Sequence, residues 1–395
     1  MKTLLGLRRC HYMARLSIFL IIIALVIEIA GCSTNPISYT LTISNTEGGE
    51  VMNPGEGVFT YKEVTIVNLV ATPDSNYRFV KWSGDVGTIG DVNAATTIIT
   101  INGNYSIMAN FAPDLEMLEI RDWYDLDDIR NNLVGNYLLM NDLNSITAGY
   151  TELAGSTAND GKGWQPIGTE NQQFTGVFNG QGYEIKGLLI NRSSESYVGL
   201  FGAVVGTVQD VGVVNANING RVRVGCLVGE NNYGTVNNCY ATGSVNGISE
   251  ESGRVGGLVG RNYYGTVNNC YATCSVTSAY CGGLVGYNDH ETVNNCYATG
   301  SVTFQSAFHF SIGGLVGYNT EGTVINSFWD TETSGQAISW GGIGKTTAEM
   351  KEIDTFLDTG WNIVAVANRY TRNLSYIWNM VDDETYPFLS WQPIS

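Results

Sequence analysis

Residues 234–242 read GTVNNCYAT, and residues 265–273 repeat the same letters. A third copy, ETVNNCYATGSV, occupies residues 291–302. A glycine-rich box precedes each copy, as GCLVG at residues 225–229 and as GGLVG at residues 256–260 and 282–286, and a further GGLVG box stands at residues 313–317. The box leucines, Leu227, Leu258, Leu284 and Leu315, follow one another after 31, 26 and 31 residues. A period of this length is typical of a solenoid.

The repeats predict a parallel β-helix. Each repeat is too short to bury its own apolar side chains, whereas coils stacked about 4.8 Å apart can cover one another. We therefore expect an all-β, right-handed parallel β-helix over residues 164–340. In such a stack the paired asparagines at 237–238, 268–269 and 294–295 lie in register, where their amides can hydrogen-bond from coil to coil. Asn326 continues the second of these columns.

The glycine boxes resemble the GLUG motif, which is found in bacterial surface proteins and beside the protease domain of some IgA-cleaving metallopeptidases. Residues 198–202, VGLFG, are a divergent copy of the same box. The resemblance covers residues 164–340 and implies a surface-exposed repeat array.

Residues 38–112 have a different pattern, in which apolar and polar residues alternate. Leu41 and Ile43 alternate with threonines, and turn sequences such as Asn53-Pro54-Gly55 separate the runs. This pattern predicts a small β domain. Its phrases YTLTISNTEGGEV, ATPDSNYRFVKWSGD and NYSIMANF resemble the divergent internalin-B-type bacterial repeat. The resemblance implies a β-grasp-like module that acts as a spacer or a weak binding unit.

Two segments are expected to cap the solenoid, whose end strands and apolar core would otherwise be exposed. In residues 113–163, the N-terminal cap, apolar residues follow Asp122 at helical spacing. In residues 341–395, the C-terminal cap, Thr346 and Glu349 have capping-box spacing. We expect this cap to fold back on the last coil with its aromatic residues: Trp361, Trp378, Tyr386 and Trp391.

The glycine-rich residues 341–346 do not form a phosphate loop. Ser339 stands where such a loop needs its first glycine, and no βαβ pattern precedes it. We interpret these residues as a turn into a helix.

Residues 1–31 have the features of a signal peptide. Basic residues precede the apolar run 16–27, which is too short to span a membrane comfortably. The run leads into Ile29-Ala30-Gly31-Cys32, which resembles the lipobox of prokaryotic lipoproteins. The resemblance implies cleavage before Cys32, lipidation of its thiol, and a membrane tether through the linker 32–37. An uncleaved signal anchor or an ordinary secretory signal is the alternative.

The charge of the chain excludes several partners. Its 395 residues carry a formal net charge of −17, and only 14% of them are charged. Nucleic acid and anionic lipid headgroups would repel such a surface. We expect a monomer without a nucleic-acid partner, which meets the membrane through its lipid anchor and binds a glycan or a surface protein.

No residue pattern predicts catalysis, a cofactor or a metal site. His290-Glu291 is not followed by the rest of an HExxH motif, and no cysteine cluster has zinc spacing. No aspartate stands between Val211 and Asn288. The acid–base pair of a polysaccharide-cleaving β-helix is therefore missing from these coils.

Cys239, Cys270 and Cys296 share one repeat position and are expected to pack as small apolar thiols in the core. Direct stacking holds their Cβ atoms about 4.8 Å apart, wider than a disulfide prefers. Cys274 replaces a repeat glycine, and a bridge from it to Cys281 stays open. Cys226 replaces a box glycine and is interpreted as drift.

Tyr240, Tyr271 and Tyr297, continued by Phe328, form another column and are the candidate ligand-contact stripe. Facing outward, the rings could stack on sugars or on the surface of a partner. Facing inward, they would be an aromatic core ladder. The sequence leaves both alternatives open.

Together these features predict a non-enzymatic lipoprotein at the cell envelope, outside the cytoplasm, that serves in adhesion or ligand display. One alternative is a carbohydrate-binding or polysaccharide-cleaving β-helix. The other is a purely structural component of the envelope.

Overall fold

The computed structural model describes residues 37–74, 77–113, 117–248, 253–304 and 311–393. The chain divides into two compact units, residues 1–115 and residues 116–395. Cys32, the expected lipidation site, and the expected signal peptide lie outside the described residues. Over the described ranges, no helix has both the length and the apolar character that a membrane crossing requires.

The N-terminal unit is a small β domain with two sheets. One has the order β3-β1-β7-β5, with β1 and β7 parallel, and the other is the antiparallel sheet β2-β4-β6. Leu41, Ile43 and Trp82 are buried in its core, so the expected alternation is confirmed. Its described residues contain no helix, and the likeness to a β-grasp is limited to the mixed sheet. The strands are β1 (Ser38–Asn45), β2 (Gly49–Asn53), β3 (Gly57–Lys62), β4 (Thr65–Pro73), β5 (Tyr77–Gly84), β6 (Thr96–Ile101) and β7 (Tyr105–Pro113).

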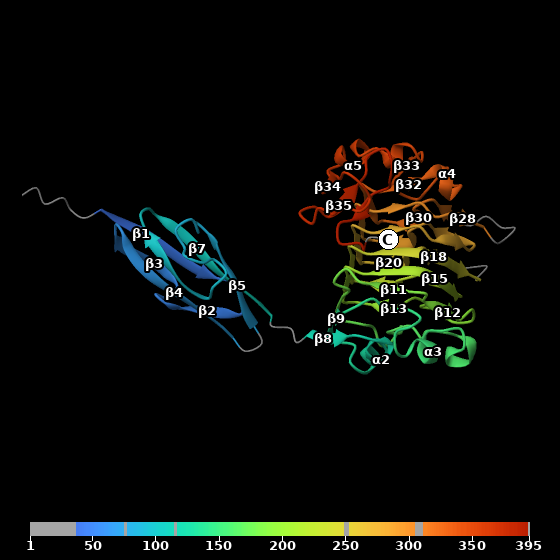
Figure 1. The fold of residues 1–395 in the computed structure, drawn as a ribbon, viewed down its shortest axis with the longest axis horizontal. Coiled ribbons are helices and arrows are strands. Elements are labelled where there is room, and N and C mark those ends of the chain that lie inside the picture. The colour runs from blue at the N-terminus through green and yellow to red at the C-terminus, as the bar shows by residue number, and fades with distance from the viewer. Residues whose placement is uncertain (1–36, 75–76, 114–116, 249–252, 305–310, 394–395) are drawn as a thin grey trace, which may run out of the picture. The chain divides into compact units, whose positions relative to one another are not determined.

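The second unit is a β-solenoid. Figure 1 shows its coils stacked between α2 (Trp123–Asp128) at one end and α5 (Asp354–Leu357) at the other. One sheet has the order β8-β9-β10-β14-β17-β21-β26-β31, and a second has the order β11-β15-β18-β22-β27-β32-β33 with β12, β23 and β28 beside it. A third, β13-β16-β20-β25-β30, carries the last two residues of each box, and a short one is β19-β24-β29.

The strands of the solenoid are short, which suits coils that turn several times. Their bounds are β8 (Met117–Ile120), β9 (Asn136–Leu139), β10 (Val177–Asn179), β11 (Glu184–Lys186), β12 (Leu189–Asn191), β13 (Phe201–Val204), β14 (Thr207–Gln209), β15 (Gly212–Gly220), β16 (Val228–Asn232), β17 (Thr235–Asn237), β18 (Tyr240–Gly247), β19 (Val255–Gly256), β20 (Val259–Tyr263), β21 (Thr266–Asn268), β22 (Tyr271–Ala272), β23 (Ser275–Thr277), β24 (Tyr280–Gly282), β25 (Val285–Asp289), β26 (Thr292–Asn294), β27 (Tyr297–Ala298), β28 (Val302–Thr303), β29 (Ser311–Gly313), β30 (Val316–Thr320), β31 (Thr323–Ile325), β32 (Phe328–Asp330) and β33 (Ile343–Lys345).

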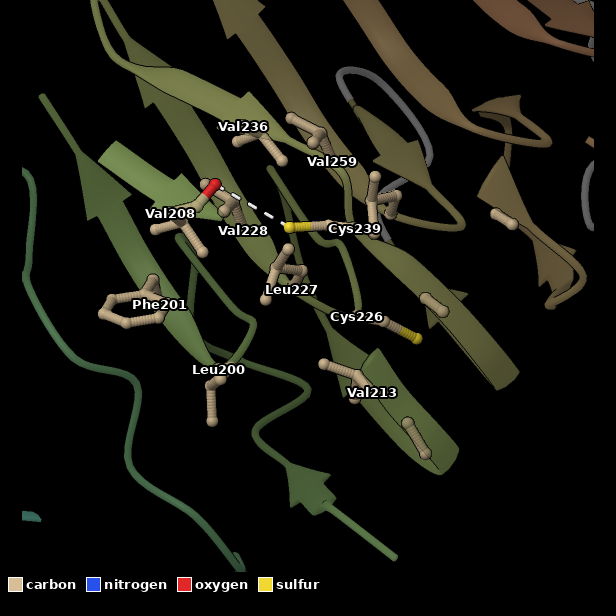
Figure 2. Close-up of a cluster of buried hydrophobic side chains, with 14 of the residues drawn as sticks. Leu200, Phe201, Val208, Val213, Cys226, Leu227, Val228, Val236, Cys239 and Val259 are labelled. Atoms are coloured by element: carbon tan, nitrogen blue, oxygen red, sulfur yellow. Dashed lines mark hydrogen bonds between the residues drawn. The ribbon is translucent and has the colours of Figure 1, made fainter. Parts of the chain in front are cut away.

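The box leucines lie directly above one another, as the repeat predicted. The N–H of Leu227 donates to the carbonyl of Leu258 at 3.1 Å, and the N–H of Leu258 donates to Leu284 at 3.0 Å. The N–H of Leu284 continues to Leu315 at 2.9 Å, and all four side chains are fully buried. Figure 2 shows Leu227 in this core among Leu200, Phe201, Val228 and Val236. The predicted stacking of coils is confirmed.

The second asparagine of each pair turns a corner of the coil. Asn238, Asn269, Asn295 and Asn326 have φ values of 53°, 50°, 51° and 46°. Asparagine tolerates this left-handed conformation better than other residues that carry a Cβ. The repeated asparagine therefore reflects backbone geometry as well as the side-chain hydrogen bonds that the sequence predicted.

The N-terminal cap consists of short helical turns. They are α2 (Trp123–Asp128), η1 (Ile129–Asn131), α3 (Tyr150–Leu153) and η2 (Ala158–Gly161). Asp122 caps α2 by accepting hydrogen bonds from the N–H groups of Tyr124 and Asp125. The stacking of strands begins earlier than Trp164, because β8 and β9 already belong to the same parallel sheet as β10.

The C-terminal cap covers more of the solenoid than its last coil. Its elements after β33 are η3 (Glu349–Lys351), α5 (Asp354–Leu357), β34 (Ile363–Ala365), β35 (Trp378–Met380) and β36 (Phe388–Leu389), and α4 (Thr331–Ser334) precedes β33. Thr346 and Glu349 form the predicted reciprocal capping box, at 2.8 and 3.2 Å. The glycine-rich residues before it lead into strand β33, which pairs with β32, so the expected turn into a helix is only partly correct.

Candidate functional site

The predicted ligand-contact stripe is a stacked column, but it is buried. The rings of Tyr240 and Tyr271 lie 4.9 Å apart with an angle of 4°, and those of Tyr271 and Tyr297 lie 4.9 Å apart with an angle of 3°. Tyr240 and Phe328 are 1% exposed, and Tyr271 is 5% exposed. No solvent-facing stripe exists at these positions, and that alternative is wrong.

The C-terminal cap is what covers the column. These rings lie outside the main solenoid core and form a second cluster with Trp361, Trp378 and Leu389. The hydroxyl of Tyr271 donates to Oε1 of Gln392 at 2.8 Å. Burial raises the pKa of the Tyr271 hydroxyl above its usual range. The column is thus the docking surface of the chain's own C-terminal segment.

A different aromatic surface is open to solvent. It lies on β20, β25 and β30, on the turns that follow β16, β20 and β25, and on Trp340 shortly before β33. We call it the aromatic face. Tyr233 is 62% exposed, Trp340 46% and Tyr318 39%. Its residues are Tyr233, Tyr263, Tyr264, Tyr287, His290, Tyr318 and Trp340.

The rings of the aromatic face form two runs along the stack of coils. Tyr233 stacks on Tyr264 at 5.0 Å and 7°, and Tyr264 stacks on His290 at 4.6 Å and 15°. In the neighbouring column, Tyr287 lies 5.4 Å from Tyr318, and Tyr318 meets Trp340 edge to face at 4.9 Å. Rings in contact at successive coils make each run continuous, and we call the two neighbouring runs together the aromatic strip.

Ion pairs lie among the rings and hold the strip in place. Glu230 forms an ion pair with Arg223 at 2.6 Å and accepts a hydrogen bond from Arg261 at 3.4 Å. Arg261 also donates to Asp289 at 2.6 Å, and its guanidinium lies 4.1 Å from the centre of the Tyr263 ring. Burial disfavours the charged form of Arg261, yet Asp289 and Glu230 outweigh it and raise its pKa. The buried carboxylates are therefore paired, and the face carries little net charge.

A ladder of buried asparagines supports the face from inside. Asn231 donates to Asn262 at 2.8 Å, Asn262 to Asn288 at 2.8 Å, and Asn288 to Asn319 at 2.9 Å. Asn231, Asn262 and Asn288 are fully buried. Because each amide is fixed by the next, the ladder sets the register of the strands that carry the rings.

Sequence comparison identifies both kinds of domain. The family model of the divergent InlB B-repeat domain matches residues 39–115, and that of the GLUG motif matches residues 251–277 and 278–303. The chain carries a divergent InlB B-repeat domain and GLUG motifs. The GLUG motifs lie on successive coils of the β-solenoid. The boxes at residues 225–229 and 313–317 stack in the same register as the matched GLUG motifs.

Two relatives share parts of this sequence. Halomucin of Haloquadratum walsbyi is 38% identical over 103 residues, which is 25% of this chain and 1% of halomucin. A protein of Evansella cellulosilytica, provisionally named a Gly-rich membrane protein, is 36% identical over 120 residues, 29% of this chain and 13% of the relative. The matched part is therefore a small fraction of each relative's length.

Two solved structures are also similar. A Bacteroides ovatus protein, provisionally named an immunoglobulin A1 protease, matches with a TM-score of 0.46 and 18% identity, over 71% of this chain and 93% of that one. A chain named IgA1 Protease matches with a TM-score of 0.37 and 14% identity, over 85% of this chain and 30% of that one.

The cysteine column of the GLUG repeats lies in the core, as predicted. Cys239, Cys270 and Cys296 are free and fully buried. The N–H of Cys239 donates to Sγ of Cys270 at 3.4 Å, and the N–H of Cys270 donates to Sγ of Cys296 at 3.4 Å. Over the described part of the chain, no three His, Cys, Asp or Glu side chains are grouped as a metal site.

Sequence reasoning missed the aromatic face because its residues differ between repeats. Tyr233, Tyr264, His290 and Glu321 occupy one turn position, at φ values of 61°, 49°, 70° and 54°. A search for positions that carry the same residue in every repeat does not find such a position. The sequence does contain a usable signal. Between each glycine box and the Thr-Val strand that follows it, one position carries an aromatic or charged residue, whereas the neighbouring positions are nearly constant.

Proposed function

We propose that this chain is a non-catalytic ligand-binding protein of the cell surface, whose aromatic face holds a neutral glycan. The observation that carries the proposal is the exposed strip of contacting rings along successive coils. Aromatic side chains with a hydroxyl or indole N–H combine an apolar body with a polar tip. Sugars present the same combination of apolar C–H groups and hydroxyls.

Charge favours a neutral ligand. Glu230 and Asp289 each pair with an arginine at 2.6 Å, so neither is left to attract a cationic partner. The strongly negative chain as a whole would repel a polyanion. An uncharged, extended glycan lying along the coils would contact rings on successive coils. It would need no unpaired carboxylate and would not be repelled by the negative charge of the chain.

The paired carboxylates also support a binding role over cleavage. Glycoside hydrolysis needs one carboxyl group that gives up a proton and a second that acts on the opposite side of the sugar. Glu230 and Asp289 are 5% exposed each, and both are bound by Arg261. We propose that the chain acts as a monomer, tethered through a lipid on Cys32, and displays this face outside the cytoplasm.

Binding to immobilised neutral polysaccharides tests the proposal. The full chain is passed over β-glucan, mannan, xylan and galactan, next to the triple variant Tyr233→Ala/Tyr264→Ala/Tyr318→Ala. We expect the wild type to be retained on at least one of these polysaccharides. The triple variant should lose about tenfold or more in affinity, because each ring contributes about 0.5–1.5 kcal/mol.

The matched control is Tyr370→Ala/Tyr376→Ala, which removes exposed rings of the C-terminal cap, 61% and 39% exposed. This variant is expected to bind like the wild type. If the triple variant of the aromatic face binds as tightly as the wild type, the aromatic face is not the binding site. Attachment to cells that survives enzymatic removal of their glycans would point to a protein ligand instead, and release of sugar from the polysaccharide would end the non-catalytic assignment.

A further inference from the structure

Two cysteines that break the repeat meet in the core. Cys226 stands where the other boxes have Gly257, Gly283 and Gly314. Cys274 stands where the other copies have Gly243 and Gly300. The two departures are 48 residues apart in sequence, yet their sulfur atoms lie 3.4 Å apart. Both side chains are fully buried, and Figure 2 shows Cys226 pointing into the core beside Val213.

The repeat normally leaves no room for a side chain at either position. A Cβ added to Gly257 would lie 2.2 Å from the carbonyl oxygen of Gly283 and 2.9 Å from Cβ of Ala272. A Cβ added to Gly300 would lie 1.9 Å from the carbonyl oxygen of Cys274. Each departure therefore requires a local change of packing. That both occur, on adjacent coils and facing each other, is poorly explained by independent drift.

The other thiols of the core have separate partners. Sγ of Cys281 donates to the carbonyl of Ser278 at 3.5 Å, so the bridge from Cys274 to Cys281 that the sequence left open does not match the structure. Sγ of Cys239 donates to the carbonyl of Asn237 at 3.1 Å. The sulfurs of Cys226 and Cys274 lie 3.4 Å apart, and a disulfide would require them to approach to about 2.05 Å.

We propose that Cys226 and Cys274 form a disulfide that staples two adjacent coils of the solenoid. In this step the two thiols lose two protons and two electrons, and an S–S bond forms between them. A disulfide-bearing oxidant, a protein or glutathione disulfide, accepts the electrons and protons and leaves as two thiols. The oxidant must act during folding, because both sulfurs are sealed from solvent in the folded solenoid.

The staple would act on the coils that carry the aromatic face. The loop that it closes contains Tyr233, Tyr263 and Tyr264, together with Arg261. Cross-linking the ends of this loop restricts the unfolded chain and opposes separation of the two coils. The rings that contact each other across this pair of coils would then keep their spacing even if the surrounding structure loosened.

Counting the reactive thiols of denatured protein tests the proposed disulfide, because the count should rise in some variants and fall in others. The full chain is folded in the presence of glutathione disulfide, denatured without reductant and labelled with a maleimide. Wild type should show two more reactive thiols after reduction. Cys226→Gly and Cys274→Gly restore the glycine of the repeat, and each should raise the unreduced count by one, because the abandoned partner becomes free.

Cys239→Ala is the matched control and should lower the unreduced count by one. A fall by one for Cys226→Gly as well, or an equal wild-type count before and after reduction, would overturn the proposal. Mass spectrometry of unreduced chymotryptic peptides from the wild type gives a second reading that does not depend on any variant folding. A cross-linked peptide containing residues 226 and 274 is expected, and a cross-link between any other pair in its place would contradict the assignment.

Discussion

The hydroxyl of Tyr297 donates to the carbonyl oxygen of Pro387 at 2.5 Å, a contact between residues 90 positions apart. Tyr297 belongs to the repeat array, and Pro387 belongs to the segment that follows it. The contact shows that the end of the chain lies against the side of the solenoid as well as over its last coil. The tyrosine column of the repeats is therefore part of a packed interface within one chain.

Truncation of Tyr297 should loosen the C-terminal cap. The ring is 2% exposed and lies 5.9 Å from the ring of Trp378. We expect Tyr297→Ala to cost about 3–5 kcal/mol in the free energy of unfolding of the solenoid. Tyr297→Phe, which removes only the hydrogen bond, should cost about 1 kcal/mol. Urea unfolding followed by tryptophan fluorescence measures both, and a loss for Tyr297→Ala as small as that for exposed Tyr376→Ala would contradict the buried interface.

The asparagine ladder predicts a second sensitive position. Asn262 both donates to Asn288 and accepts from Asn231, at 2.8 Å each. Asn262→Ala leaves Oδ1 of Asn288 without its donor and removes one of three contacts of the Asn231 amide, which still donates to Gly234 and Thr266. The unpaired buried oxygen should cost about 1–3 kcal/mol. Asn246→Ala, at a half-buried position with one amide contact to Asn219, is the control and should cost less. If the wild type, Asn262→Ala and Asn246→Ala have the same midpoint in thermal unfolding, the ladder adds no stability.

The left-handed corner predicts an unusual order of substitutions at Asn269. Its φ of 50° suits glycine and disfavours a β-branched residue. Glycine fits the backbone but loses the amide contacts to Asn237 and Asn295, so we expect Asn269→Gly to be the milder change. Asn269→Val should destabilise the solenoid by about 1–2 kcal/mol more. Denaturant midpoints of the two variants give the comparison. The reverse order, with valine the better substitute, would mean that the corner does not have this geometry in solution.

Asp330 should make stability depend on acidic pH. Burial alone would raise the pKa of this carboxyl group, but hydrogen bonds from Thr347, Tyr386 and two backbone N–H groups outweigh it and lower the pKa. Since the folded value lies below the unfolded one, the stabilisation is complete above the unfolded pKa, about 4, and is lost as the pH falls through the folded value.

The check is a series of unfolding experiments between pH 7 and pH 2 on the wild type and Asp330→Asn. The amide cannot ionise, so the variant should be less stable at neutral pH and should lose less stability on acidification. Parallel curves for the two proteins would rule out Asp330 as the source of the pH dependence.

The sequence predicted the solenoid because the same residues recur where coils touch, as at Leu227 and Leu258. It could not predict the burial of Tyr271, because the covering residues, such as Trp378 and Gln392, lie far along the chain and have no repeat of their own. The start of the stack at β8 was also missed, since Met117–Ile120 has no glycine box. The aromatic face escaped notice because it is built from the positions where the repeats differ.

Hydroxyl-radical footprinting of the full chain, with and without the neutral polysaccharide that it binds, shows which side chains the bound glycan covers. If the aromatic face holds the glycan, the ligand lowers the oxidation of Tyr233, Tyr318 and Trp340, which are exposed there, and leaves that of Tyr370 and Tyr376 of the cap unchanged. Protection of the cap tyrosines with no change on the face, or no protection by any neutral polysaccharide, would contradict binding at this face.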